Sequence, residues 1–298
     1  MTISALNQQF GISDHLDFFE GTGSLPCVRI NNEHAECILS LYGAHVLSFK
    51  PAGQPDLLWM SDTSAFEYGK AIRGGIPVCF PWFGPHASDN KKPQHGFARL
   101  SVWEVKSTQQ LQNGSTELVL TLKENEETMK LWPFLFEAEL TVVAGAAFTI
   151  SLQIKNTGDK IFTYTDALHT YFNISDLSHL QIGGLAGTSW YNGFASETTV
   201  LQEELLTISK EENRRYINHE TDCVITDAGY QRKINVSKTG SKVTVVWNPY
   251  EETAKNIGDM PDDGYNTFIC VEAANAYTDA VTLEPGQLHT ISQTFSVQ

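Results

Sequence analysis

Hydrophobic and polar residues alternate along several stretches of this chain with a period of two. This period is typical of strands that bury one face and expose the other. It recurs over residues 135–143, 147–155, 232–237, 242–247 and 288–297. We therefore predict a strand at each of these five positions.

Turn residues separate several of the predicted strands. Asn113-Gly114 precedes the apolar run 115–122, the segment NTGDK (156–160) follows one predicted strand, and KTGSK (238–242) lies between two others. Asn-Gly pairs and short Gly-containing polar segments commonly close β-hairpins. We therefore predict antiparallel hairpins at these turns.

The sequence lacks the amphipathic helices that would connect parallel strands. Only residues 64–70 and 251–257 could form one or two helical turns, whereas a parallel crossover needs a dozen or more residues. No Pro/Ser-rich linker, charge block or repeat of fixed period divides the chain. The predicted fold class is all-β: one large antiparallel β-sandwich over residues 1–298, with a functional site on its face or in its loops.

The charge balance limits the partners of such a sandwich. The 298 residues include 20 Lys plus Arg against 35 Asp plus Glu, a formal net charge of −15. This charge opposes binding to nucleic acid or to an anionic membrane. It does not exclude a small anionic ligand, because screening acts over about 8 Å and a few arginines in a cleft can dominate locally.

Cysteine usage and the N-terminal residues indicate a reduced, cytoplasmic protein. The five cysteines are odd in number, scattered and without CxxC spacing, and residues 1–15 lack a basic segment followed by an apolar one. The longest apolar runs are far shorter than the ~20 residues that span a bilayer. We predict no transmembrane segment.

Candidate binding residues are densest in RGGIPVCFPWFGPH (73–86) and PQHGFAR (93–99). Glycines and prolines prevent a strand over much of the first stretch, so we predict a rigid irregular loop. A single arginine is most often a solvated or structural charge. However, Arg73 and Arg99 both flank Gly-rich segments, and guanidinium groups bind phosphate oxygens in bidentate fashion.

Two further ionisable residues interrupt apolar runs. His169 lies in DALHTYFNISD (166–176), and Glu272 lies in FICVEAAN (268–275). Each has a structural alternative, a hydrogen-bonded core histidine for the first and an ion-paired or edge carboxylate for the second. Histidine also titrates nearest neutrality and suits proton transfer, and ionisable residues in apolar settings are often functional.

Signatures of metal and cofactor chemistry are missing. The sequence contains no HExxH, paired CxxC or His pair at i, i+4, and no GxxxxGK[ST], GxGxxG or GxSxG. We therefore predict no metal and no cofactor. What remains is acid/base chemistry by side chains alone, or binding without catalysis.

Together, GAHVLSFKP, RGGIPVCFPWFGP, QHGFAR, ALHTYFNISD, WNPY and GDMPDDGYNTFICVE resemble the glucose-6-phosphate 1-epimerase family, relatives of the aldose 1-epimerases. The resemblance runs from about Gly43 to Glu272, with order and spacing kept. It implies the galactose-mutarotase-like super-sandwich and interconversion of the α and β anomers of a hexose 6-phosphate. It also implies a small sugar phosphate as the partner, and a monomer is the expected form.

Family roles transfer to the matching positions of this sequence. The resemblance implies His169 as the acid and Glu272 as the base. It further implies that the sugar phosphate is held by Arg73, Gln94, His95, Arg99 and Asp222. Relatives usually place Arg after the residue that matches Asp222, whereas Cys223 follows it here.

Two other functions fit the same residues. In a mutarotase for unphosphorylated aldoses, Arg73 would be structural. In a non-catalytic sugar-binding sandwich, the pocket would persist without acid/base chemistry. In each of these functions Trp82, Phe83 and Trp247 either cover the apolar face of a pyranose or belong to the core.

Overall fold

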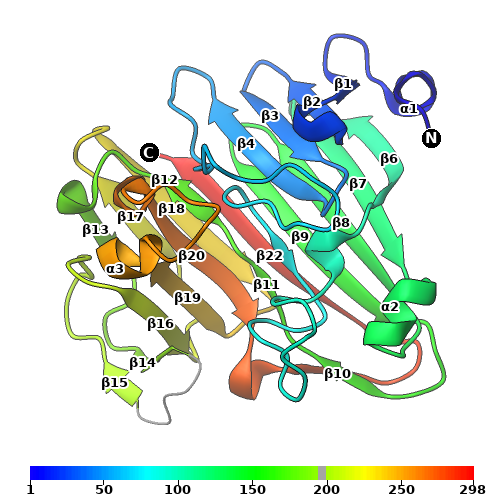
Figure 1. Ribbon diagram of the computed structural model, residues 1–298. Helices are drawn as coiled ribbons and strands as arrows, with labels where there is room; N and C mark the ends of the chain where they lie inside the picture. The colour runs from blue at the N-terminus through cyan, green and yellow to red at the C-terminus, as the bar shows by residue number, and fades with distance from the viewer. Residues whose placement is uncertain (194–198) are drawn as a thin grey trace.

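The computed structural model describes residues 1–193 and 199–298 and consists mainly of antiparallel sheets (Figure 1). The first large sheet has eight strands in the order β13-β17-β18-β22-β9-β8-β7-β6. Its strands are β6 (Glu104–Gln110), β7 (Thr116–Lys123), β8 (Phe136–Ala144), β9 (Phe148–Asn156), β13 (Leu180–Gly183), β17 (Cys223–Asp227), β18 (Arg232–Thr239) and β22 (Leu288–Val297). Four of the five strands predicted from alternation lie in this sheet, and the fifth, at 242–247, is a strand of the second.

The second large sheet carries the candidate site. Its order is β15-β14-β16-β19-β20-β11-β5, and β12 also pairs with β20. Its strands are β5 (Val78–Cys79), β11 (Asp166–Leu168), β12 (Tyr171–Asn173), β14 (Ser189–Asn192), β15 (Thr199–Leu201), β16 (Glu212–Ile217), β19 (Val243–Asn248) and β20 (Phe268–Asn275).

Two smaller sheets complete the architecture. One has four strands in sequence order, and the other is formed by β10 and β21. Their strands are β1 (Leu16–Glu20), β2 (Pro26–Asn31), β3 (Ala35–Ser40), β4 (His45–Pro51), β10 (Phe162–Tyr164) and β21 (Val281–Leu283).

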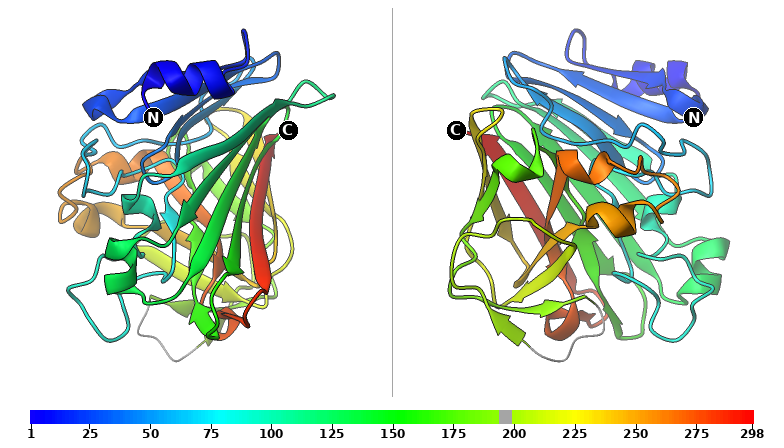
Figure 2. Two further views of the ribbon diagram at one scale, coloured as in Figure 1. Left: turned by 90° about the vertical axis from the view of Figure 1, so that its right-hand side faces the viewer. Right: turned by 60° about the vertical axis from the view of Figure 1, so that its left-hand side comes forward.

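The core lies between the first large sheet and the sheets that cover it (Figure 2). Phe49 of the four-stranded sheet packs 4.8 Å from Phe148, and Phe172 of the second large sheet packs 5.1 Å from Phe295, measured between ring centroids. Phe148 and Phe295 belong to neighbouring strands of the first sheet. Both covering sheets therefore bury apolar faces against the same partner, and the prediction of an all-β antiparallel sandwich is confirmed.

The helices are short and only partly follow the prediction. They are α1 (Ile3–Phe10), α2 (Glu126–Leu131) and α3 (Tyr250–Ala254), with 3-10 turns η1 (Thr22–Ser24), η2 (Ala98–Leu100), η3 (Leu177–His179), η4 (Gly264–Thr267) and η5 (Tyr277–Asp279). α3 overlaps the predicted segment 251–257, whereas residues 64–70 form turns. Tyr42, from outside that segment, binds its backbone: the hydroxyl accepts a hydrogen bond from the Gly69 amide and donates one to the Lys70 carbonyl. The described residues contain no helix long and apolar enough to cross a membrane.

One of the three predicted hairpins is present. The turn at Asn113-Gly114 joins β6 to β7, which pair antiparallel. The turn at 156–160 instead leads from β9 to β10, and that at 238–242 leads from β18 to β19, so both carry the chain from one sheet to another. Turn residues mark where the chain reverses, but pairing depends on which sheet buries the apolar face of the next strand. The two hairpin predictions are therefore wrong.

Candidate active site

Glu272 lies on a fully buried strand of the second large sheet. All eight residues of β20 are buried, and the Glu272 side chain is only 1% exposed. Its apolar neighbours on the strand fit a position between β19 and β11, where the strand has partners on both sides. A carboxyl group in this setting loses its hydration and needs a specific partner.

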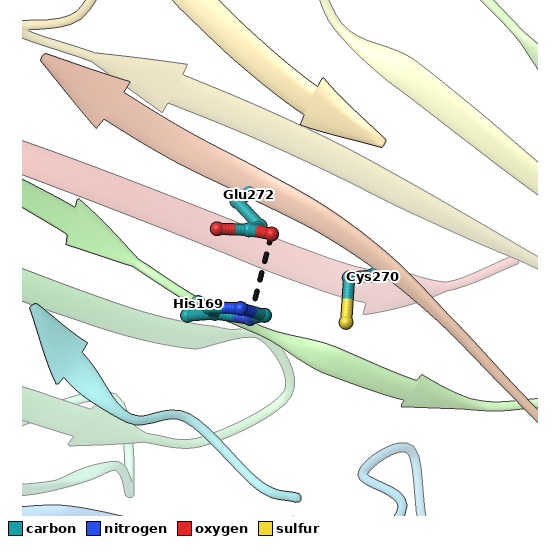
Figure 3. A group of neighbouring side chains, drawn as sticks. All are labelled: His169, Cys270 and Glu272. Carbon is teal, nitrogen blue, oxygen red and sulfur yellow. Dashed lines mark ion pairs between the residues drawn. The ribbon is translucent and has the colours of Figure 1, made fainter. Parts of the chain in front are cut away.

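His169 is that partner, and strand register places it there. β11 and β12 both pair with β20, with Leu168 opposite Ala273 and Tyr171 opposite Cys270. The register against β20 is the same in β11 and in β12, which lie on either side of His169. His169 therefore stands opposite Glu272. The His169 Nδ1 lies 3.4 Å from the Glu272 Oε1, and the two side chains face each other in Figure 3.

The Gly-rich loop brings Arg73 to the same region. Gly74 and Gly75 have φ angles of 107° and 58°, and a Cβ on Gly75 would lie 2.0 Å from the Val46 carbonyl oxygen. Only glycine permits this approach to β4. The segment is otherwise irregular apart from the two-residue β5, which pairs with β11. The predicted rigid loop thus contacts β4 of the four-stranded sheet and pairs with β11 of the second large sheet, close to Arg73.

The second loop positions His95 and Arg99. His95 is clamped to Gly84 by two hydrogen bonds: its amide donates to the Gly84 carbonyl at 2.7 Å, and its Nδ1 accepts from the Gly84 amide at 3.1 Å. Because Nδ1 accepts, the neutral imidazole carries its proton on Nε2. Arg99 Nη2 donates to the Gln94 carbonyl at 2.7 Å.

These loops and strands enclose one cavity of about 210 Å³. Six of the seven site residues predicted from the sequence line it: Arg73, Gln94, His95, Arg99, His169 and Glu272. The seventh, Asp222, does not. It is exposed just before β17 in the first large sheet, where its Oδ2 accepts a hydrogen bond from Asn235. Among the aromatic candidates, Phe83 and Trp247 line the cavity, whereas Trp82 lies outside it.

Sequence reasoning did not select three other lining residues, Asn213, Val245 and Ile257. Asn213 stands opposite Trp247, and Val245 stands opposite Glu272, in the pairing of β16, β19 and β20. The positions of Asn213 and Val245 follow from sheet register, whereas Ile257 comes after α3. The only local signal was the alternation of residues 242–247, which places Val245 and Trp247 on one face.

The two arginines differ in how their charges are balanced. Arg73 pairs with Asp259 through Nε and Nη2, both at 3.1 Å, and its Nη1 donates to the Tyr171 hydroxyl at 3.2 Å. Among the described residues, Arg99 forms no ion pair, and its buried Nε has no hydrogen-bond partner. Arg99 therefore supplies most of the uncompensated positive charge in the cavity.

Burial controls the protonation of the central pair. It raises the pKa of Glu272 well above the usual range, while the positive charge of Arg215 opposes that shift. Burial, assisted by Arg99 and Arg73, lowers the pKa of His169 to about 3. The pKa of His95 is also well below its ordinary value, chiefly through burial. At neutral pH the cavity therefore favours a neutral imidazole facing a carboxyl group that holds a proton readily.

Cys270 lies two residues before Glu272 on β20, beside the His169–Glu272 pair (Figure 3). One possible ligand atom from each of His169, Cys270 and Glu272 lies within 4.8 Å of the others. A metal ion would need the thiolate and the carboxylate. Burial instead raises the pKa of Cys270 well above its usual range, and two guanidinium groups share the cavity. This environment favours an anionic ligand and proton transfer over cation binding.

Comparison with known proteins shows the family of the chain. The family model for aldose 1-epimerase matches residues 26–296. An Escherichia coli K12 protein named "Putative glucose-6-phosphate 1-epimerase" is 38% identical over 87% of each chain, and a Cenchrus ciliaris protein of the same name is 34% identical over 83% of this chain and 77% of its own. The crystal structure of a "putative mutarotase" from Salmonella typhimurium has a TM-score of 0.89 at 32% identity, covering 97% of this chain and 95% of that one.

The antiparallel sandwich and the matched relatives define a sugar epimerase of the mutarotase type. The chain belongs to the aldose 1-epimerase family. The fold extends to more distant structures, including a galactose mutarotase related enzyme from Lactobacillus acidophilus with a TM-score of 0.72 at 17% identity.

Proposed function

We propose that this protein is a glucose-6-phosphate 1-epimerase that interconverts the α and β anomers of glucose 6-phosphate or a related hexose 6-phosphate. The observation that carries the proposal is the pairing of His169 and Glu272 in a cavity that also holds the uncompensated Arg99. The names of the relatives at 34–38% identity support the same substrate.

Mutarotation requires two proton movements at the anomeric centre. The ring oxygen gains a proton as the C1–O5 bond breaks, and the anomeric hydroxyl loses one. After rotation about C1–C2, the ring closes on the other face of the carbonyl and the transfers reverse. One donor and one acceptor that exchange roles suffice, and we assign His169 as the acid and Glu272 as the base of ring opening.

Substrate binding adjusts the proton distribution of this pair. Without substrate, Arg99 and Arg73 disfavour the imidazolium form of His169. A bound phosphate dianion offsets both guanidinium charges, and this raises the pKa of His169 while the sugar is in place. The phosphorylated substrate thereby moves the acid toward the protonated form that ring opening needs.

Phosphate recognition falls to the loop residues in this proposal. Arg99 has free donor capacity at its Nε, and Arg73 is fixed by Asp259 and Tyr171 so that its fork is already oriented. His95, with its proton on Nε2, and the side chain of Gln94 add neutral donors to the same cavity. Phe83 and Trp247 can cover the apolar face of the pyranose.

We also infer a reduced, cytoplasmic setting and a monomeric enzyme. All five cysteines are buried and free, which fits a compartment that keeps thiols reduced. A single chain supplies the His169–Glu272 pair and both arginines of the cavity, which fits a monomeric enzyme.

Magnetisation exchange between the two anomeric proton resonances tests the function directly. With catalytic amounts of protein, glucose 6-phosphate should show exchange well above the uncatalysed rate, and glucose should show much less. Equal acceleration of both sugars would favour a mutarotase for unphosphorylated aldoses. Binding of glucose 6-phosphate without acceleration would favour a non-catalytic module.

A further inference from the structure

Arg215 shares the sheet face that carries Glu272. In the pairing of β16 with β19, Arg215 stands opposite Val245, and in the pairing of β19 with β20, Val245 stands opposite Glu272. Residues directly opposite in neighbouring strands point to the same face of a sheet. Arg215, Val245 and Glu272 therefore form one row across three strands, with only the apolar Val245 between the two charged residues.

The described residues around Arg215 include an aromatic ring and an apolar cluster. The residue has no solvent exposure, and its guanidinium carbon lies 4.2 Å from the centre of the Tyr277 ring. Tyr277 and Val245 belong to the small apolar cluster between this sheet face and the loop of residues 73–86. A buried guanidinium group costs several kcal/mol unless other charges offset its loss of hydration. Among the described residues, the charge of Glu272 acts on Arg215, and Arg215 in turn is the cation that acts most on Glu272.

We propose that Arg215 is a positioning residue whose charge favours the ionised form of Glu272, the form that accepts a proton from the anomeric hydroxyl. The proposal rests on the function assigned above and adds to it a residue outside the cavity. Burial by itself drives Glu272 toward the protonated form, in which it cannot act as a base. The charge of Arg215 opposes that tendency.

Other ionisable groups also face the environment of Glu272. They come from the loops, from the neighbouring strands and from β20 itself: Arg73, Cys79, His95, Arg99, His169, Tyr171 and Cys270. Among their cations, Arg73 and Arg99 line the cavity and are the proposed phosphate ligands, so bound substrate cancels their charges. Arg215 does not line the cavity, and its charge acts on Glu272 with substrate bound or absent.

The acid limb of the pH profile of kcat/KM tests this role. In Arg215→Gln we expect the limb to move up by about one pH unit, so that activity on the acid side of the profile falls by up to about tenfold while activity on the alkaline side is largely kept. Arg215→Lys should shift the limb in the same direction by less, because a charge on a shorter stem remains. The exposed Arg29, which lies on β2 and pairs with Asp17, provides the control Arg29→Gln, which should leave the limb unchanged.

An unshifted acid limb in folded Arg215→Gln would overturn the proposal, as would a uniform loss of activity at every pH. If the Gln variant does not fold, the Lys variant decides: a limb identical to that of the parent would overturn it. These results differ from failure of the proposed function itself. In that case the parent protein would show no Glu272-dependent anomer exchange at any pH.

Discussion

Replacing Glu272 by Gln is expected to lower kcat for anomer exchange of glucose 6-phosphate by about 10²–10⁴-fold, the usual contribution of one positioned proton-transfer group. The amide keeps the shape of the side chain but cannot accept the proton of the anomeric hydroxyl. KM should change little, since the proposed phosphate ligands lie on the loops of residues 73–99. The comparison uses magnetisation exchange or polarimetry at saturating substrate.

Folding of the Glu272→Gln variant should be preserved. The substitution replaces a buried group whose ionised form is disfavoured with a neutral one, so the thermal midpoint at pH 7 should be unchanged or higher. Glu284→Gln makes the same chemical change at an exposed loop position and should keep full activity. A Glu272→Gln variant with parental kcat would mean that another group accepts the proton.

Replacing Arg99 by Met is expected to lower kcat/KM for glucose 6-phosphate by about 10- to 10²-fold, with little effect on glucose. A charge-assisted hydrogen bond contributes about 1.5–3 kcal/mol. Among the described residues, no carboxylate pairs with Arg99 and neutralises its charge. Methionine retains the apolar stem. The measurement is the ratio of kcat/KM values for the two sugars, which cancels general damage to the active site.

Arg73 offers a matched comparison on the same cavity. Asp259 and Tyr171 already engage its guanidinium group, so Arg73→Met should also loosen the loop and lower activity on both sugars, with a smaller change in their ratio. An Arg99→Met variant that loses equal activity on glucose and glucose 6-phosphate would remove Arg99 from the phosphate site.

The strands could be predicted from the sequence because each carries its own pattern. Residues 135–143 and 147–155 alternate strictly and became β8 and β9, which pair with each other. Sheet membership could not be predicted in this way. The turn at 238–242 has the composition of a hairpin turn, yet β18 and β19 lie in different sheets. Local residues set the reversal, and distant apolar faces decide the pairing.

The site residues were likewise predictable only where the local sequence carried a signal. The loops that carry Arg73, His95 and Arg99 have dense and unusual composition, and motif resemblance added the roles of His169 and Glu272. The structure brings these residues together in one cavity but leaves Asp222 outside it, just before β17 of the first large sheet.

Arg215 had no comparable signal, and Asp259 lay in the motif GDMPDDGYNTFICVE without an assigned role. Their roles depend on cross-strand register and on a contact between Arg73 and Asp259 that joins segments 186 residues apart. A carboxylate or guanidinium group in a polar stretch of sequence resembles any surface charge until the fold supplies its partner.

A crystal structure of the inactive Glu272→Gln variant with glucose 6-phosphate bound would test the central claim most directly. We predict the anomeric carbon between the imidazole of His169 and the amide of residue 272, with the phosphate on the guanidinium of Arg99 and next to Arg73. A sugar phosphate bound with its phosphate toward His169, or bound outside this cavity, would contradict the account.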